Sequence, residues 1–179
     1  MAQITQTGFP PVYINGYIVA QLKEFGILSG YEQMNPILPT TPTNIEDLFK
    51  NYIGAPGDPD PLLIQYEKLA RFRPNSLYRH KRDQLVYYVY STNLEKMFNA
   101  TRIIIEALDR EDAAAQDVNS WMIENKEDFE GTLNVLFHNI KVYQTDESRD
   151  ILNSVSARIV HVNKIIIEYD YHTTQSYYN

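Results

Sequence analysis

The chain has 179 residues, a formal net charge of −7 and no cysteine. Its length suits one domain with a sizeable core, and its content of 44% hydrophobic and 12% aromatic residues argues against wholesale disorder. The lack of cysteine excludes disulfides, thiolate nucleophiles and zinc held by cysteine.

An extended arm is predicted to open the chain over residues 1–14, because Pro10 and Pro11 disfavour helix. Asn15 would then cap a short helix over residues 16–25, which a glycine ends. The opening residues carry neither the basic nor the apolar stretch of a signal peptide.

The next stretch is rich in proline and turn residues. Residues 29–43 contain three prolines and are predicted to form a stiff, extended connector. A two-turn helix is expected over residues 45–53 and a turn-rich linker over 54–61. Residues 1–60 therefore form an N-terminal arm with short helices in this interpretation.

A compact core domain is expected over residues 61–171. Apolar side chains alternate over residues 62–66, which predicts its first strand. A basic loop over 71–82 follows. Residues 84–91 are apolar or aromatic on both alternating faces, which predicts a second strand.

The hydrophobic period changes at Asn93 from that of a strand to that of a helix. Residues 94–108 carry one apolar stripe at i, i+3, i+4, i+7 spacing: Leu94, Met97, Phe98, Thr101, Ile104, Ile105 and Leu108. Asp109 is predicted to cap a second helix, with Asp112 at its third position. Its inward residues would be Ala114, Val118, Trp121 and Met122.

Two further strands are expected near the C-terminus. Residues 133–143 form a strand whose apolar phase slips near His138, as a bulge would cause. Residues 144–150 are polar and predict a turn or a long loop. Residues 155–171 alternate as a long final strand, and 172–179 form a C-terminal tail.

This order of elements predicts an α+β fold, a mostly antiparallel four-stranded sheet with helices packed on one face and an extended N-terminal arm. The other face is also apolar on the second strand, through Val86, Tyr88 and Tyr90. A second apolar face needs cover from the arm or from another subunit.

Charge is segregated along the chain. Residues 71–82, the basic segment, hold five bases and no acid: Arg71, Arg73, Arg79, Lys81 and Arg82. Residues 106–130, the acidic segment, hold nine acids and two bases, and begin with Glu106, Asp109, Glu111 and Asp112. The basic segment could contact DNA phosphates, complement the acidic segment of the same or the next subunit, or face solvent.

Catalytic motifs are not found in the sequence. The four histidines, at 80, 138, 161 and 172, have no nucleophile or acid at motif spacing, although the two on predicted strands, His138 and His161, could face each other across a hairpin. The acids near Glu106 could hold a hard cation, but acids around a helix junction also favour the helix dipole. Glycine-rich phosphate loops are absent. We therefore expect no enzyme activity, cofactor or metal.

Roughly residues 36–171 resemble the tail terminator (tail-completion) proteins of tailed bacteriophages, particularly contractile-tailed ones. The similarity lies in ILPTTPTN, PLLIQYE, YRHKRDQLVYYVYS, LDREDAAAQDVNSW and SARIVHVNKIIIEY. The resemblance implies a virion protein, assembled in the host cytoplasm, that forms a hexameric ring at the head–tail junction. Implied partners are tail tube, sheath and neck or connector proteins, with DNA passing through the lumen without specific binding.

The resemblance implies neither a cofactor nor a catalytic residue. Two alternatives stay open: another neck or baseplate component with the same core, and a small nucleic-acid-binding or regulatory module that uses the basic segment. No run of about 18 apolar residues is present, so we expect no membrane-spanning segment.

Overall fold

The computed structural model describes residues 9–28, 37–40, 62–69, 80–110, 112–129, 135–152 and 159–173, with the backbone alone for residues 80, 144 and 146–152. Its strands are β1 (Ile37–Pro39), β2 (Leu62–Leu69), β3 (His80–Ser91), β4 (Val135–Leu152) and β5 (Ile159–Thr173). Its helices are α1 (Pro10–Glu24), α3 (Leu94–Leu108) and α4 (Asp112–Glu124), with a 3-10 turn, η3 (Lys126–Asp128).

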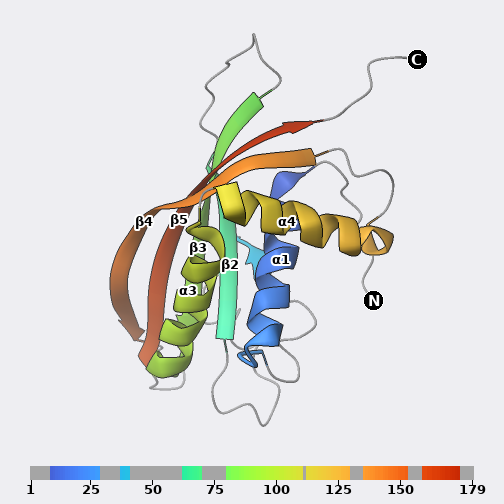
Figure 1. Ribbon diagram of the computed structural model, residues 1–179. Coiled ribbons are helices and arrows are strands. Elements are labelled where there is room, and N and C mark those ends of the chain that lie inside the picture. Colours follow the sequence, from blue (N-terminus) through green and yellow to red (C-terminus); the bar gives the residue numbers. More distant parts are fainter. Residues whose placement is uncertain are drawn as a thin grey trace, which may run out of the picture.

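The fold is α+β, as predicted, with the strands in one five-stranded sheet of order β1-β2-β3-β5-β4. The described helices lie together on one side of it (Figure 1). The pairs β2–β3, β3–β5 and β5–β4 are antiparallel, whereas β1 pairs parallel with β2. The sheet is therefore mixed. The prediction of a four-stranded, mostly antiparallel sheet was wrong because it lacked the parallel edge strand β1.

Strand β1 lies inside the stretch expected to be a proline-rich connector. Its three residues pair with Ile64–Tyr66, and the Thr40 N–H donates to the Tyr66 carbonyl at 2.8 Å. Pro39 is compatible with this position because an edge strand leaves one row of its backbone groups unpaired. A three-residue strand is too short to show a sequence period.

The N-terminal prediction was wrong, because Pro10 and Pro11 begin a helix instead of excluding one. They occupy the first turn of α1, where the missing N–H has no helical partner to lose. Asn15 is therefore inside the helix, and its side-chain oxygen accepts a hydrogen bond from the buried Tyr87 hydroxyl at 2.7 Å. Gly26 has φ of 68°, the left-handed conformation that follows many helices.

The buried face of α1 belongs to the main hydrophobic core. Tyr13, Ile14 and Ile18 are fully buried in one cluster with residues of β2, β3, β5, α3 and α4. An extended arm over residues 10–14 is therefore not observed.

Helix α3 has the predicted bounds, and the Asn93 side chain caps it by accepting from the Lys96 N–H at 3.0 Å. Its stripe was wrong in part, since Leu94 and Phe98 are exposed. Ala100, Ile103 and Ala107 are buried in addition to the predicted inner residues. The buried face is thus rotated about the helix axis relative to the predicted stripe, because α3 packs against both the sheet and α1.

Helix α4 begins at Asp112, and its inward side was predicted correctly. Ala114, Val118 and Met122 are buried, and Trp121 packs half-buried against the core. Asp109 is not the predicted cap of this helix. It follows α3 as its C-cap residue, and its carboxylate accepts a hydrogen bond from the Val142 N–H at 3.3 Å.

Strand β4 runs through the region predicted to be a turn. Residues 144–150 pair with β5 within a strand of 18 residues, so the turn prediction was wrong. The predicted slip near His138 is confirmed by a register shift between Phe137 and Asn139, and two more shifts follow. Polar residues suit an edge strand, because only one side of it is paired.

The alternation of β5 is confirmed: Ile165, Ile167, Tyr169 and Tyr171 are buried on the helix side. The strand continues through His172 and Thr173, which were predicted to belong to the tail. Strand β3 likewise starts at His80, so Lys81 and Arg82 are in a strand and not in the predicted loop.

Several predictions concern residues outside the described part of the chain: the helix over 45–53, the linker over 54–61 with its domain boundary, and the end of the tail at 174–179. Among the described helices, none is long and apolar enough to cross a membrane.

Candidate subunit interface

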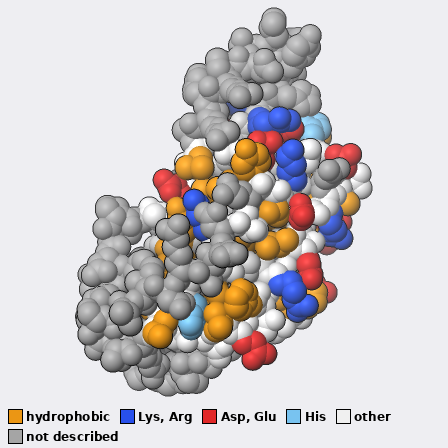
Figure 2. Space-filling model, turned by 90° about the vertical axis from the view of Figure 1, so that its left-hand side faces the viewer, with side chains coloured by type: hydrophobic (Ala, Val, Ile, Leu, Met, Phe, Trp, Pro, Cys, Tyr) orange, Lys and Arg blue, Asp and Glu red, His pale blue; other side chains and the backbone are white. Residues whose placement is uncertain are grey.

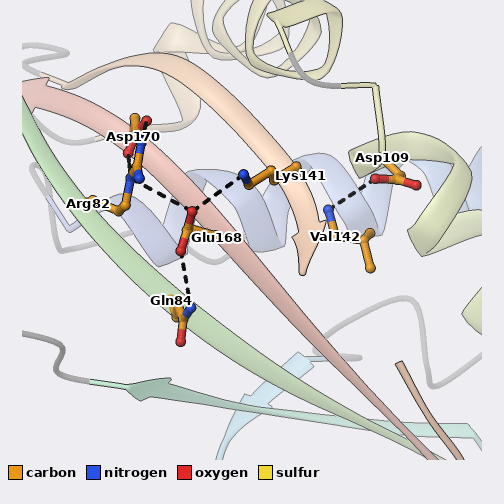
Figure 3. Close-up of polar contacts among 7 residues, drawn as sticks. All are labelled: Arg82, Gln84, Asp109, Lys141, Val142, Glu168 and Asp170. Carbon is orange, nitrogen blue, oxygen red and sulfur yellow. Dashed lines mark hydrogen bonds and ion pairs between the residues drawn. The ribbon is translucent and has the colours of Figure 1, made fainter. Parts of the chain in front are cut away.

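The sheet face that points away from the helices, here called the outer face, carries a row of paired charges. The Arg82 guanidinium binds both oxygens of Asp170, with Nε–Oδ1 at 2.6 Å and Nη2–Oδ2 at 2.7 Å. Glu168 lies 3.8 Å from Arg82 and 3.7 Å from the Lys141 ammonium. It also accepts a hydrogen bond from the Gln84 amide at 3.2 Å (Figure 3).

This row crosses three strands, because β3, β5 and β4 place its members opposite one another. Arg82 is the register partner of Asp170, and Glu168 is the partner of both Gln84 and Lys141. The hydrogen bonds that Arg82 donates to Asp170, followed by the negative charge of that carboxylate, raise the pKa of Arg82 above its ordinary value. The row is thus a set of ion pairs within one chain.

An apolar cluster occupies the other end of the outer face. It consists of Leu63, Tyr90 and Val160, with Leu38, Tyr88 and Val162 packed half-buried against them. The rings of Tyr88 and Tyr90 stack with centroids 6.3 Å apart. Burial raises the pKa of Tyr90 to about 12.

The sequence predicted that the apolar outer face would need cover, and the structure refines this. Val86 and Tyr90 are only 2% and 6% exposed within the single chain, so they do not form an open surface. Tyr88 is half-buried. On the side of the molecule at the left of Figure 1, hydrophobic side chains gather in separate groups with charged ones between them (Figure 2).

The outer edge of β4 is capped by two helix-side residues in its first half. The side-chain amide of Asn119, on α4, makes two hydrogen bonds with the backbone of Phe137. It donates to the Phe137 carbonyl at 2.8 Å and accepts from the Phe137 N–H at 3.0 Å. Asp109 accepts from the Val142 N–H in the same manner. Alternate residues of an edge strand direct their backbone groups away from the sheet, so these contacts block strand addition there.

No such side-chain cap is observed beyond Val142 for the described backbone of β4. Tyr143, at the boundary, is 54% exposed, and Leu136 on the same strand is 40% exposed. Large apolar side chains are also exposed elsewhere in the described residues: Phe25, Leu94, Phe98, Ile123 and Ile159. Tyr143 thus directly follows the last β4 residue whose backbone is capped by a described side chain.

The structure places the predicted site residues in separate regions. Lys81 is exposed on β3 and Arg82 is in the charged row, while Arg71, Arg73, Arg79 and Glu111 lie outside the described residues. Glu106, Asp109 and Asp112 are exposed at the junction of α3 and α4. Arg82 pairs with β5 and not with the acidic segment, where Arg110 pairs with Asp117 instead.

Sequence reasoning missed four members of the charged row: Gln84, Lys141, Glu168 and Asp170. Glu168 and Asp170 alternate with apolar residues, so their position on a solvent-facing side was visible. Their partners were not, because nothing in the sequence says that β3 lies beside β5.

The described part of the chain holds no group of three or more His, Cys, Asp or Glu side chains that could bind a metal ion together. Ion pairs join β2 to β3 (Lys68–Asp83), β3 to β5 (Arg82–Asp170) and β5 to β4 (Glu168–Lys141). The arrangement is therefore suited to holding strands in register and presenting a surface.

The chain matches no known protein family, and no curated protein is similar to it at a significant level.

Proposed function

We propose that the protein is a structural subunit of a tailed-bacteriophage virion. It would act at the head–tail junction as a tail terminator, forming a hexameric ring that caps the tail tube and joins it to the neck. The proposal starts from the resemblance of roughly residues 36–171 to tail terminators.

The supporting observation is the edge strand β4. At 18 residues it spans about 60 Å at 3.3 Å per residue. Among the described side chains, Asn119 and Asp109 cap its first half, and the exposed Tyr143 follows the last residue so capped. A partly capped edge with an exposed aromatic residue is suited to contact between neighbouring subunits.

The test is the assembly state of the full chain, measured by native mass spectrometry with negative-stain electron microscopy. We expect a hexamer with a central hole wide enough for a DNA duplex. Tyr143→Glu should leave a folded monomer, because it puts a charge at the proposed contact. Phe25→Glu is the matched control: Phe25 is 59% exposed at the end of α1, and this variant should still form rings.

The proposal fails if the wild-type chain stays monomeric both alone and with purified tail tubes. The role of the β4 edge fails if Tyr143→Glu assembles as the wild type does. Binding to a head connector or baseplate but not to tube ends would favour another neck or baseplate component.

The nucleic-acid-binding alternative predicts DNA affinity that falls steeply with salt. Arg82 already pairs with Asp170, which leaves fewer bases of this segment for phosphates. DNA binding with a slope of several phosphates would favour that alternative over the virion role.

A further inference from the structure

Two histidines meet at the charged end of the outer face, on neighbouring strands. Nε2 of His138 lies 2.5 Å from Nδ1 of His172, and the two rings are stacked with centroids 4.7 Å apart. Both side chains are half-buried, so solvent and small ions can reach them. They belong to no catalytic or assembly feature described above.

His138 is the extra residue of a β4 bulge. It lies between Phe137, the register partner of Tyr171, and Asn139, the partner of Asp170, and its ring reaches that of His172. The Cα of His80 on β3 is the register partner of the Cα of His172. Of the four histidines, His80 and His172 are thus register partners, and His138 contacts His172 from the bulge of β4.

Asn139 gives a second, independent observation. It follows His138 in the chain, and its side-chain oxygen is buried with no hydrogen-bond partner among the described residues. Buried polar atoms are normally satisfied, so this oxygen, on the residue next to His138 in the chain, has a hydrogen bond still to be made.

We propose that His138 and His172 bind a divalent transition-metal ion of the class that prefers imidazole, such as Zn²⁺, Ni²⁺ or Cu²⁺. Two nitrogens bound to one tetrahedral zinc at 2.0–2.1 Å lie about 3.3 Å apart, so the rings need to separate by less than about 1 Å. Water completes the coordination. The site does not depend on the function proposed above.

The test uses the full, untagged chain, because an affinity tag of histidines would bind the same ions. Zn²⁺ titration by calorimetry should give one site per chain. Electron paramagnetic resonance of the Cu²⁺ complex should show coupling to two imidazole nitrogens. Mg²⁺, which prefers oxygen ligands, should not compete.

His138→Ala and His172→Ala should each weaken Zn²⁺ binding by at least about tenfold, since even loss of a group that only supports a ligand costs 10–100-fold. His161→Ala is the matched control, because His161 lies on β5 at a position of the opposite face, paired with Ser91. Circular dichroism checks that each variant is folded.

The proposal is overturned if the wild-type chain binds no Zn²⁺ at millimolar concentration. It is also overturned if His161→Ala weakens binding as much as the other two variants do. In either case the His138–His172 contact is a hydrogen bond between strands and not a metal site.

Discussion

Arg82 illustrates how a residue's role depends on its partner. Its sequence neighbours made it a candidate for contact with another subunit or with DNA. In the structure two nitrogens of its guanidinium donate hydrogen bonds to the two carboxylate oxygens of Asp170, and the Glu168 carboxylate lies 3.8 Å away. Its side chain is 59% exposed, however, so solvent screens the pair and limits its contribution to stability.

We expect a double-mutant cycle on Arg82→Met and Asp170→Asn to give a coupling energy of about 0.5–1 kcal/mol. The measurement is the free energy of unfolding in urea for the wild type, both single variants and the double variant. Arg102→Met, an exposed change on α3, serves as the control for loss of charge alone. A coupling energy near zero would show that the ion pair does not hold β3 and β5 in register.

At the scale of elements, the packing of α1 on α4 depends on the absence of a side chain at Gly16. A Cβ atom at this position would lie 2.3 Å from Cη2 of Trp121. The indole also contacts Phe129, with ring centroids 5.8 Å apart, so it has little freedom to move aside. Gly16 therefore sets how closely the two helices approach.

Gly16→Ala should destabilise the protein by about 1–3 kcal/mol, the usual cost of overpacking. A loss of stability would be opposite to the usual effect, because replacing glycine by alanine inside a helix ordinarily stabilises by roughly 0.5–1 kcal/mol. Thermal and urea unfolding measure the effect.

The control for this prediction is the same change in a Trp121→Val background, where the clash is removed. There, Gly16→Ala should become neutral or stabilising. If Gly16→Ala stabilises the wild-type chain, the packing of α1 on α4 described above is incorrect.

At the scale of the whole molecule, the tyrosines couple stability to alkaline pH. Burial, followed by neighbouring acidic groups, raises the pKa of Tyr169 and Tyr171, and burial raises that of Tyr87. Tyr90 has its pKa raised to about 12 from the usual 10.0. These residues lie on both faces of the sheet, so their ionisation affects the fold as a unit.

The free energy of unfolding should fall as pH rises from 10 towards about 12. In that window an unfolded tyrosine has lost its proton, whereas folded Tyr90 keeps it, so high pH favours the unfolded state. Urea unfolding across this range measures the slope. Tyr90→Phe should reduce the slope. A slope equal to that of the wild type would contradict the assignment.

Local patterns in the sequence determined the elements whose signals lie within a few residues. Asn93 and the stripe that follows it predicted α3 with its observed bounds, and alternation predicted β2, the inner face of β5 and the bulge near His138. These signals are local because capping and side-chain period depend only on neighbouring residues. The α+β class followed from their order.

Only the tertiary structure decided what depends on residues far apart in the chain. Burial of Tyr13 and Ile14 makes a helix of a segment in which two prolines had suggested an arm. Pairing with β5 makes a strand of the polar residues 144–150. The contacts of Arg82 with Asp170 and of His138 with His172 likewise follow from strand order and register. The physical reason is that long-range pairing is set by the packing of the whole core, which no short window of sequence contains.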